Sequence, residues 1–189
     1  MFTVALCTRR PAIADDLNAV VAAVTTVIAS QEEHGRGEIV LQLADPMGVL
    51  QMIVEAARHP GVCIGVGADS GGGRSRLTPL DYARRALKRA RSRSGDMPVV
   101  IYGRATEAAS WATSLAQLVH FCLLRRSEPG WEVSRLVARG ISQKDAAEDL
   151  GITEQAVSQR LRAAGFREVR NIEPLLLCLL EQAAHIPTR

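Results

Sequence analysis

The chain has 189 residues, a formal net charge of +3, and 47% hydrophobic but only 4% aromatic residues. This length accommodates one or two domains, and the hydrophobic fraction is large enough to build their cores. The apolar N-terminal run begins at once and has no basic flank, so we expect no secretory signal peptide and a cytoplasmic protein.

Cysteine and histidine are scattered along the chain. No two cysteines have the spacing of a disulfide framework or of a zinc site. We therefore expect reduced thiols within the cores, no bound metal and no cofactor. The cysteines are Cys7, Cys63, Cys122 and Cys178.

Residues 1–104 alternate the patterns of strands and helices. Short apolar runs predict strands at 2–7, 38–43, 62–67 and 97–102. Apolar residues at helical spacing predict helices that begin at Pro11, Pro46 and Pro79, the first of them continuing to Ile28. This alternation predicts an α/β domain over residues 1–104, with helices that cover a sheet.

Two segments of this domain carry cations suited to an anion. The glycine-rich loop at 69–76 contains Arg74 and Arg76, but it lacks the Lys-Ser/Thr ending of a P-loop, and a solvated loop is the simpler reading. The third helix has cations opposite its apolar stripe, and they form either a solvated face or an accessory contact for the DNA backbone or another anion. They are Arg84, Arg85, Lys88, Arg89, Arg91 and Arg93.

The run from Gly61 to Ala68 and the helix from Leu80 to Leu87 resemble the back half of SatD-type proteins, relatives of the ferredoxin-like nucleotide-cyclase and GGDEF folds. The resemblance implies that the α/β domain is ferredoxin-like or a related α/β sandwich. In those enzymes one acidic residue at the end of the first strand and another in a central hairpin hold metal. This chain has Cys7-Thr8-Arg9-Arg10 at the first place, and at the second only Asp45, which is also suited to cap a helix. The hairpin itself looks reduced or missing. The resemblance therefore implies a degenerate domain that has lost catalytic metal binding.

Residues 105–130 form a connecting region. A long helix is predicted over 106–124, followed by a linker at 125–130. The helix is either the last one of the α/β domain or a dimerising connector. Its expected apolar stripe consists of Trp111, Leu115, Leu118, Val119 and Cys122.

The stretch from Ser142 to Arg162 has the spacing of two short helices that pack across a tight turn. Ala147 is small where the helices would cross, and Gly151 falls in the turn, where a positive φ is expected. Ser142 and Thr153 are suited to cap the two helices. The apolar seam between them would consist of Ala146, Leu150, Ile152, Val157 and Leu161.

This pattern, with Gln143, Ala147, Gly151 and Val157 at fixed intervals, resembles the helix-turn-helix of repressors and sigma factors. The resemblance implies that the second helix enters the major groove of double-stranded DNA. Arg160 departs from the family, which often has a smaller or apolar residue there. The candidate DNA contacts are Gln143, Thr153, Glu154, Gln155, Ser158, Gln159, Arg162, Arg167 and Arg170.

Residues 131–189 would then form an all-α helix-turn-helix domain, supported by a helix that starts at Trp131 and lacking a wing after Gly165. The helix that opens at Pro174 is apolar on every side through Leu180, so we expect it to be buried, either within the domain or in a dimer seam. It is too short to span a membrane. From Ser127 to Arg189 there are eight basic and nine acidic residues, so one copy should bind DNA weakly and two copies are expected.

These patterns predict a homodimeric, sequence-specific DNA-binding transcriptional regulator that is not an enzyme. Gln side chains suit adenine and Arg side chains suit guanine, whereas Arg167 and Arg170 would hold phosphates. The α/β domain would supply assembly and the sensing of a small-molecule effector. Two alternatives stay open. One is a nucleotide-processing enzyme that is localised by binding DNA, and the other is a protein-interaction module in which the helix-turn-helix is a docking unit.

Overall fold

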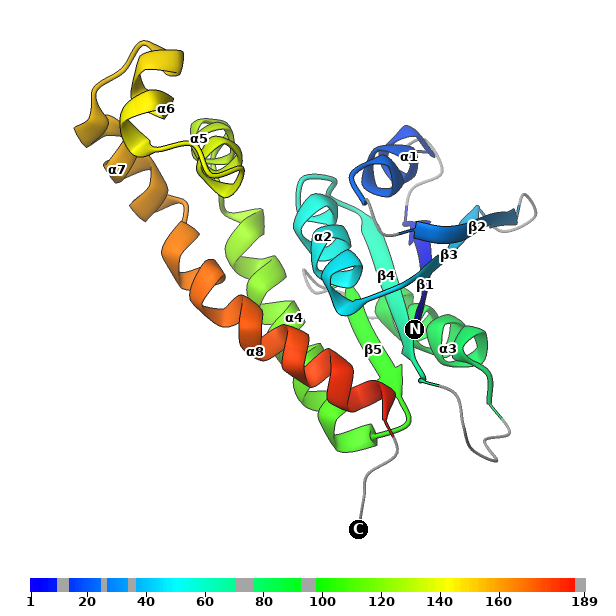
Figure 1. Ribbon diagram of the computed structural model, residues 1–189. Coiled ribbons are helices and arrows are strands. Elements are labelled where there is room, and N and C mark those ends of the chain that lie inside the picture. Colours follow the sequence, from blue (N-terminus) through cyan, green and yellow to red (C-terminus); the bar gives the residue numbers. More distant parts are fainter. Residues whose placement is uncertain (10–13, 25–26, 34–36, 71–76, 93–97, 186–189) are drawn as a thin grey trace.

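The computed structural model describes residues 1–9, 14–24, 27–33, 37–70, 77–92 and 98–185 (Figure 1). The strands in these ranges are β1 (Phe2–Thr8), β2 (Val27–Glu33), β3 (Glu38–Leu43), β4 (Val62–Ala68) and β5 (Val99–Gly103). The helices are α1 (Ala14–Ala22), α2 (Pro46–Ala56), α3 (Pro79–Ser92), α4 (Thr106–Leu124), α5 (Glu128–Ala138), α6 (Gln143–Leu150), α7 (Glu154–Ala163) and α8 (Phe166–Ala184).

The strands form one mixed sheet in the order β2-β3-β1-β4-β5. β1 lies in the centre and runs antiparallel to both β3 and β4. β2 pairs antiparallel with β3 at one edge, whereas β5 runs parallel to β4 at the other. The parallel pair needs a crossover, and α3 supplies it. The predicted α/β fold is confirmed at this level.

The two faces of the sheet carry residues of different size, because successive side chains of a strand point to opposite faces. The face under α3 carries small residues such as Ala5 and Gly65, and a Cβ on Gly65 would lie 2.2 Å from the backbone nitrogen of Leu87. The small size of these residues lets α3 pack close to the sheet. The other face carries larger residues such as Leu6 and Ile64, and α1, α2, α4 and α8 contribute to the core that covers it.

Two expectations for the N-terminal half are wrong. We predict a first helix that continues to Ile28, but α1 ends at Ala22 and β2 begins at Val27. We also predict a reduced or missing central hairpin, but β2 and β3 form one, with Val27 opposite Leu43. An apolar run of β-branched residues fits either element, and here pairing with β3 decides in favour of the strand.

The cysteines divide into two kinds. Cys7 and Cys63 are buried and lie opposite each other on β1 and β4. A hydrogen bond from Cys7, aided by Arg9 and Arg91, lowers the pKa of Cys63 to about 6 despite its burial. Cys122 and Cys178 are exposed, so the expectation that all four thiols lie in the cores is wrong for these two.

Helix α4 covers the outer edge of β5. The Thr113 hydroxyl accepts a hydrogen bond from the backbone N–H of Ile101 at 2.9 Å. The Gln117 amide donates to the backbone oxygen of Val99 at 2.8 Å. Polar groups at the open edge of the strand are thereby satisfied by side chains, which removes a surface for pairing with another chain.

Helices α4 and α8 lie side by side and run in opposite directions (Figure 1). The N–H of Ala105 donates to the oxygen of Ala183 where the start of α4 meets the end of α8. Leu176 and Leu180 of α8 are fully buried and belong to the same core as β1 and β4. The C-terminal helix is therefore part of the cover of the sheet.

The apolar stripes predicted for these helices agree only in part with the buried ones. Val119 is buried as expected, and Leu115 packs against the core. Trp111 is 54% exposed and Leu118 is 48% exposed, while the buried side of α4 is rich in alanine, including Ala112 and Ala116. α8 begins at Phe166 and contains Pro174 instead of starting there. Leu175 is 55% exposed, so the expectation of a helix buried on every side is wrong.

Helices α5, α6 and α7 gather at one end of α4 and α8 around a small core of their own (Figure 1). This core consists of Val133, Ala147, Val157 and Leu161, with Val137, Leu150, Ile152 and Phe166 against it. α5 already begins at Glu128, with Pro129 in its first turn, so the expected linker at 125–130 shortens to three residues. Residues 131–185 contribute both to this small core and to the main core on the sheet.

In the ranges described, no helix combines the length and the apolar character needed to cross a membrane.

Replacing Leu176 with alanine tests the shared core. We expect the free energy of unfolding to fall by about 2–5 kcal/mol, because a fully buried leucine would leave a cavity between α8 and the sheet. Chemical denaturation measures the change. Leu175→Ala is the matched control, since this neighbour is 55% exposed and should alter stability little. Equal losses in the two variants would contradict the packing of α8 on the sheet.

Candidate nucleic-acid interface

Helices α6 and α7 are joined by a tight turn at residues 151–153. Gly151 has φ of 63° and ends α6 in the left-handed conformation that glycine adopts without steric cost. The Ser142 hydroxyl accepts from the N–H of Asp145, and the Thr153 hydroxyl accepts from the N–H of Ala156, each at 3.1 Å. The predicted caps and the positive φ in the turn are confirmed.

The seam between the two helices also agrees with the sequence. Ala147 is 4% exposed and packs with Val157 and Leu161, while Leu150 and Ile152 close the seam from the side. A larger side chain at Ala147 would hold the helices apart. The seam thereby determines which side of α7 faces outward.

That outward side of α7 is polar. Gln155, Gln159 and Arg162 are exposed and fall on one face at helical spacing, with half-buried Ser158 between them. The opposite side of the helix contributes Val157 and Leu161 to the small core. The predicted readers of base edges therefore share one accessible surface.

A hollow of about 500 Å³ lies next to this surface, between α7, the start of α8 and the start of α6. It gathers five of the nine predicted DNA contacts, namely Gln143, Ser158, Arg162, Arg167 and Arg170. Three guanidinium groups and a single carboxylate, that of Glu168, line it. This composition gives the hollow a positive character, although residues 127–189 as a whole are near neutral.

The remaining predicted contacts lie around the same helix. Thr153 is exposed but its hydroxyl is engaged as the cap of α7, and Glu154 is exposed in the first turn.

Two arginines near this surface form ion pairs. Arg170 pairs with Glu173 at 3.1 Å; burial raises the pKa of the Glu173 carboxyl, and Arg170 opposes the rise. Arg160, the departure from the family pattern, pairs with Glu132 of α5 at 3.6 Å.

The basic face of α3 lies far along the chain from this interface and divides into two flanks. Arg84 pairs with Glu38 of β3 at 3.2 Å, so an acid from the sheet balances part of the face. Lys88 lies on the same flank, at a second hollow beside Glu38. Arg89 lies on the other flank, beside a cleft between α3, β5 and α4. Arg85 lines both this cleft and the hollow beside Glu38. Arg74, Arg76 and Arg93 lie outside the described residues.

Sequence reasoning missed a junction that attaches the three small helices to the rest of the chain. The guanidinium of Arg126 lies 4.5 Å from the centre of the Trp131 ring, and its Nε donates to the oxygen of Ala164 at 3.0 Å. Arg58 approaches the same ring at 5.7 Å. Burial lowers the pKa of Arg126. Residues 125–130 have the composition of a linker, and only the fold brings α7 back to them.

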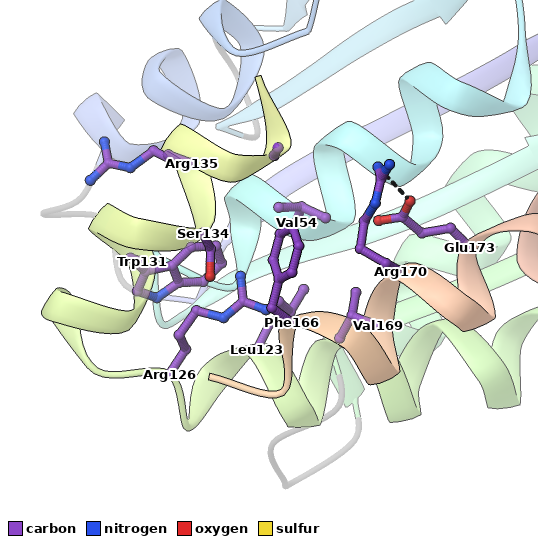
Figure 2. Close-up of a pocket in the computed structure, with 11 residues that line it drawn as sticks. Val54, Leu123, Arg126, Trp131, Ser134, Arg135, Phe166, Val169, Arg170 and Glu173 are labelled. Atoms are coloured by element: carbon purple, nitrogen blue, oxygen red, sulfur yellow. Dashed lines mark hydrogen bonds and ion pairs between the residues drawn. The ribbon is translucent and has the colours of Figure 1, made fainter. Parts of the chain in front are cut away.

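Figure 2 shows this junction, with Arg126 beside Trp131 and with Phe166 and Leu123 next to them. The space between these side chains is a hollow of about 110 Å³, which is small for a ligand. Val54 of α2 and Val169 of α8 also line it, so the sheet cover, the connecting helix and the small helices meet here. The junction serves to hold elements together.

Within the described ranges, no group of three His, Cys, Asp or Glu side chains is arranged to hold a metal ion. Comparison of the chain with protein-family models, with curated proteins and with solved structures gives no match.

Replacing Arg126 with alanine tests the junction. We expect the free energy of unfolding to fall by about 1–3 kcal/mol, because Trp131 loses its stacked cation and the oxygen of Ala164 loses its donor. Thermal or chemical unfolding measures the loss. Arg139→Ala is the matched control, since Arg139 is an exposed arginine directly after α5 with no ion pair or ring contact among the described residues. A larger loss in the control would argue against the junction.

Proposed function

We propose that this protein is a cytoplasmic transcriptional regulator that binds double-stranded DNA sequence-specifically as a homodimer. The observation that carries the proposal is the accessible polar face of α7, where Gln155, Gln159 and Arg162 are exposed opposite a well-packed seam. A capped helix that presents amide and guanidinium groups side by side has the chemistry that reads base edges in the major groove.

In this proposal, α6–turn–α7 is a helix-turn-helix of the repressor and sigma-factor type. Gln155 and Gln159 pair with adenine and Arg162 with guanine, because these side chains match the paired donors and acceptors of those bases. Arg167 and Arg170, which line the neighbouring hollow, hold phosphates and set the register of the protein on the duplex.

The N-terminal half has no assigned catalytic role in this proposal. Its first six elements follow the order β-α-β-β-α-β with strands β2-β3-β1-β4 side by side, which is the ferredoxin-like arrangement and supports a relationship with the SatD, cyclase and GGDEF group. Asp45, at one of the positions where that group holds metal, accepts from the N–H of Gly48 at 3.0 Å and caps α2. This use as a cap supports the proposed loss of catalytic metal binding.

A second copy is proposed as the partner of the outer face of α4. Trp111 and Leu118 lie seven residues apart on one side of the helix, with Leu115 between them, and the first two are half exposed. Large exposed apolar side chains at helical spacing are typical of an interface.

The charges at the two ends of this face favour a second copy of the same chain. Glu107 lies at the start of α4 and Arg125 directly after its end, both exposed and five helical turns apart on one side. If two copies pack antiparallel about a two-fold axis, Leu115 lies near the axis and Trp111 meets Leu118 of the second copy. Glu107 then faces Arg125 of the second copy at both ends.

Replacing Gln159 with alanine tests the reading of DNA. Selection of bound sequences from a random library should show that the variant loses preference at one position of each half-site, at a cost of about 1–3 kcal/mol. Arg167→Ala should weaken binding evenly across sequences and reduce the salt dependence of binding by about one counterion. Gln182→Ala, an exposed glutamine at the far end of α8, is the control. The absence of duplex binding by the wild-type protein at low salt would rule out the proposed function.

Replacing Trp111 with glutamate tests the dimer. We expect sedimentation to show monomers where the wild type shows dimers, with an unchanged melting temperature of the monomer core, because the ring is 54% exposed. Affinity for a full operator should fall while affinity for one half-site stays the same. Met47→Glu, at an exposed apolar residue of α2, is the control and should leave the dimer intact.

The end charges of the same face allow a sharper measurement. Glu107→Arg and Arg125→Glu should each weaken the dimer by placing like charges opposite each other, and the double variant should restore it. Dissociation of the double variant to the same extent as the single ones would contradict the antiparallel arrangement.

A further inference from the structure

We propose that the cleft between α3, β5 and α4 binds a small phosphorylated metabolite. The cleft has a volume of about 490 Å³, within the range of small-molecule sites and several times larger than the hollow at the junction. It is distinct from the α7 surface and lies at the N-terminal half of α4. The residues that give it its character are Tyr82, Arg85, Arg89, Tyr102, Ser110 and Ser114.

The charge of the cleft selects an anion. Arg85 and Arg89 are one turn apart on α3, and among the described residues that line the cleft there is no carboxylate. Neither guanidinium forms an ion pair within 4.0 Å in the described part of the chain. The carboxylate of Asp81, one turn before Arg85, accepts from the hydroxyl and the N–H of Thr78 at 2.7 and 2.8 Å. The hydrogen bonds from Thr78 lower the pKa of Asp81 and Arg85 adds to this effect, but neither guanidinium has a carboxylate within ion-pair distance among the described residues. Two neighbouring guanidiniums of this kind have the donors that phosphate binds.

The walls of the cleft suit a polar ring attached to that phosphate. Tyr82 and Tyr102 are half-buried, and each combines an apolar ring with a hydroxyl. The opposite wall is α4, which contributes the exposed side chains of Ser110 and Ser114. The Ser114 hydroxyl already donates to the backbone oxygen of Ser110 at 3.2 Å, so toward a ligand it acts as an acceptor. Such a lining matches a hydroxylated ring better than an aliphatic chain.

The floor of the cleft is closed by the contacts that hold α4 against β5. Thr113 and Gln117 line the cleft, and their side chains already bind the backbone of Ile101 and Val99. A ligand would therefore meet a formed wall, and the contacts left for it are the tyrosines, serines and arginines around the rim. This preformed geometry distinguishes the cleft from the other flank of α3, where Glu38 pairs with Arg84.

The position of the cleft also suggests how a bound ligand would act on DNA binding. This step rests on the proposed function. A ligand that contacts Arg89 of α3 and Ser110 of α4 joins the two helices, and α4 continues through three residues to α5. A change in the position of α4 would reach the small helices through the Arg126 junction. The binding itself does not depend on DNA and is tested without it.

The test uses the full chain and four probes: inorganic phosphate, pyrophosphate, ribose 5-phosphate and unphosphorylated ribose. Melting temperature and titration calorimetry are measured at constant ionic strength and without DNA. We expect ribose 5-phosphate to raise the melting temperature and ribose to have no effect. Arg85→Ala and Arg89→Ala should each weaken ribose 5-phosphate binding roughly tenfold or more, since each removes a charge-assisted contact. The arginines are exposed, so both variants should melt like the wild type in the absence of a probe.

Lys88→Ala is the matched control, because it removes one charge from the same helix on the flank beside Glu38. The proposal is overturned if none of the three phosphate probes binds, or if Lys88→Ala weakens binding as much as Arg89→Ala. It is also overturned if the arginine variants weaken binding to DNA and leave phosphate binding unchanged, which would make them backbone contacts. Failure of the wild-type protein to bind duplex DNA would instead affect only the proposed function.

Discussion

The outer edge of β5 carries backbone groups that need partners, and the way α4 supplies them constrains the rest of the structure. Thr113 and Gln117 bind the backbone of Ile101 and Val99, so α4 is held against the first three residues of a five-residue strand. A different register of the helix would leave these buried groups without partners, at a cost of about 1–3 kcal/mol each. The direction of α4, and with it the place where α5 begins, follows from a few side-chain to backbone hydrogen bonds.

α8 is then placed against α4 and the sheet at both of its ends. At the C-terminal end, a Cβ on Gly103 would lie 2.4 Å from the oxygen of Ala183, so only glycine permits this approach. Ser70 also donates from its N–H and its hydroxyl to the oxygen of Ala184. At the other end, Arg126 binds the oxygen of Ala164 just before α8 begins. The small helices α5 to α7 are therefore held between two long helices that the sheet itself positions, although their own core is small.

Features that depend on neighbours within a few residues could be predicted from the sequence. The caps at Ser142 and Thr153 and the left-handed turn at Gly151 are of this kind, because a short polar side chain or a glycine determines the local backbone. Three of the four predicted strands have almost the observed bounds, since continuous apolar runs between turn residues suit a strand buried on both faces. The predicted start of the fourth strand, at residue 97, lies two residues before Val99, where β5 begins.

Features decided by distant partners could not be predicted in the same way. The Trp111 stripe is the more hydrophobic side of α4, yet the alanine side faces the core because α8 and β5 approach closely there. A run of alanines at helical spacing from Ala108 to Ala116 was the available signal for this close approach. The pairing of Arg84 with Glu38 and the grouping of Arg89 with Ser110 join residues from separate elements, and no local pattern indicates them.

The different surfaces of α4 connect the proposed activities through one rigid element. One exposed side lines the cleft at Ser110 and Ser114, an adjoining side carries Trp111 and Leu118, and the helix ends next to the Arg126 junction. A ligand in the cleft and a second copy on the outer face would thus contact adjoining faces of the same helix, since Ser114 lies one turn from both Trp111 and Leu118. Because the helix is anchored to β5 by Thr113 and Gln117, a ligand could shift its equilibrium position only if it bound one position more tightly than another. The rim of the cleft, where α3 and α4 contribute separate groups to one ligand, is where such a difference in affinity would arise.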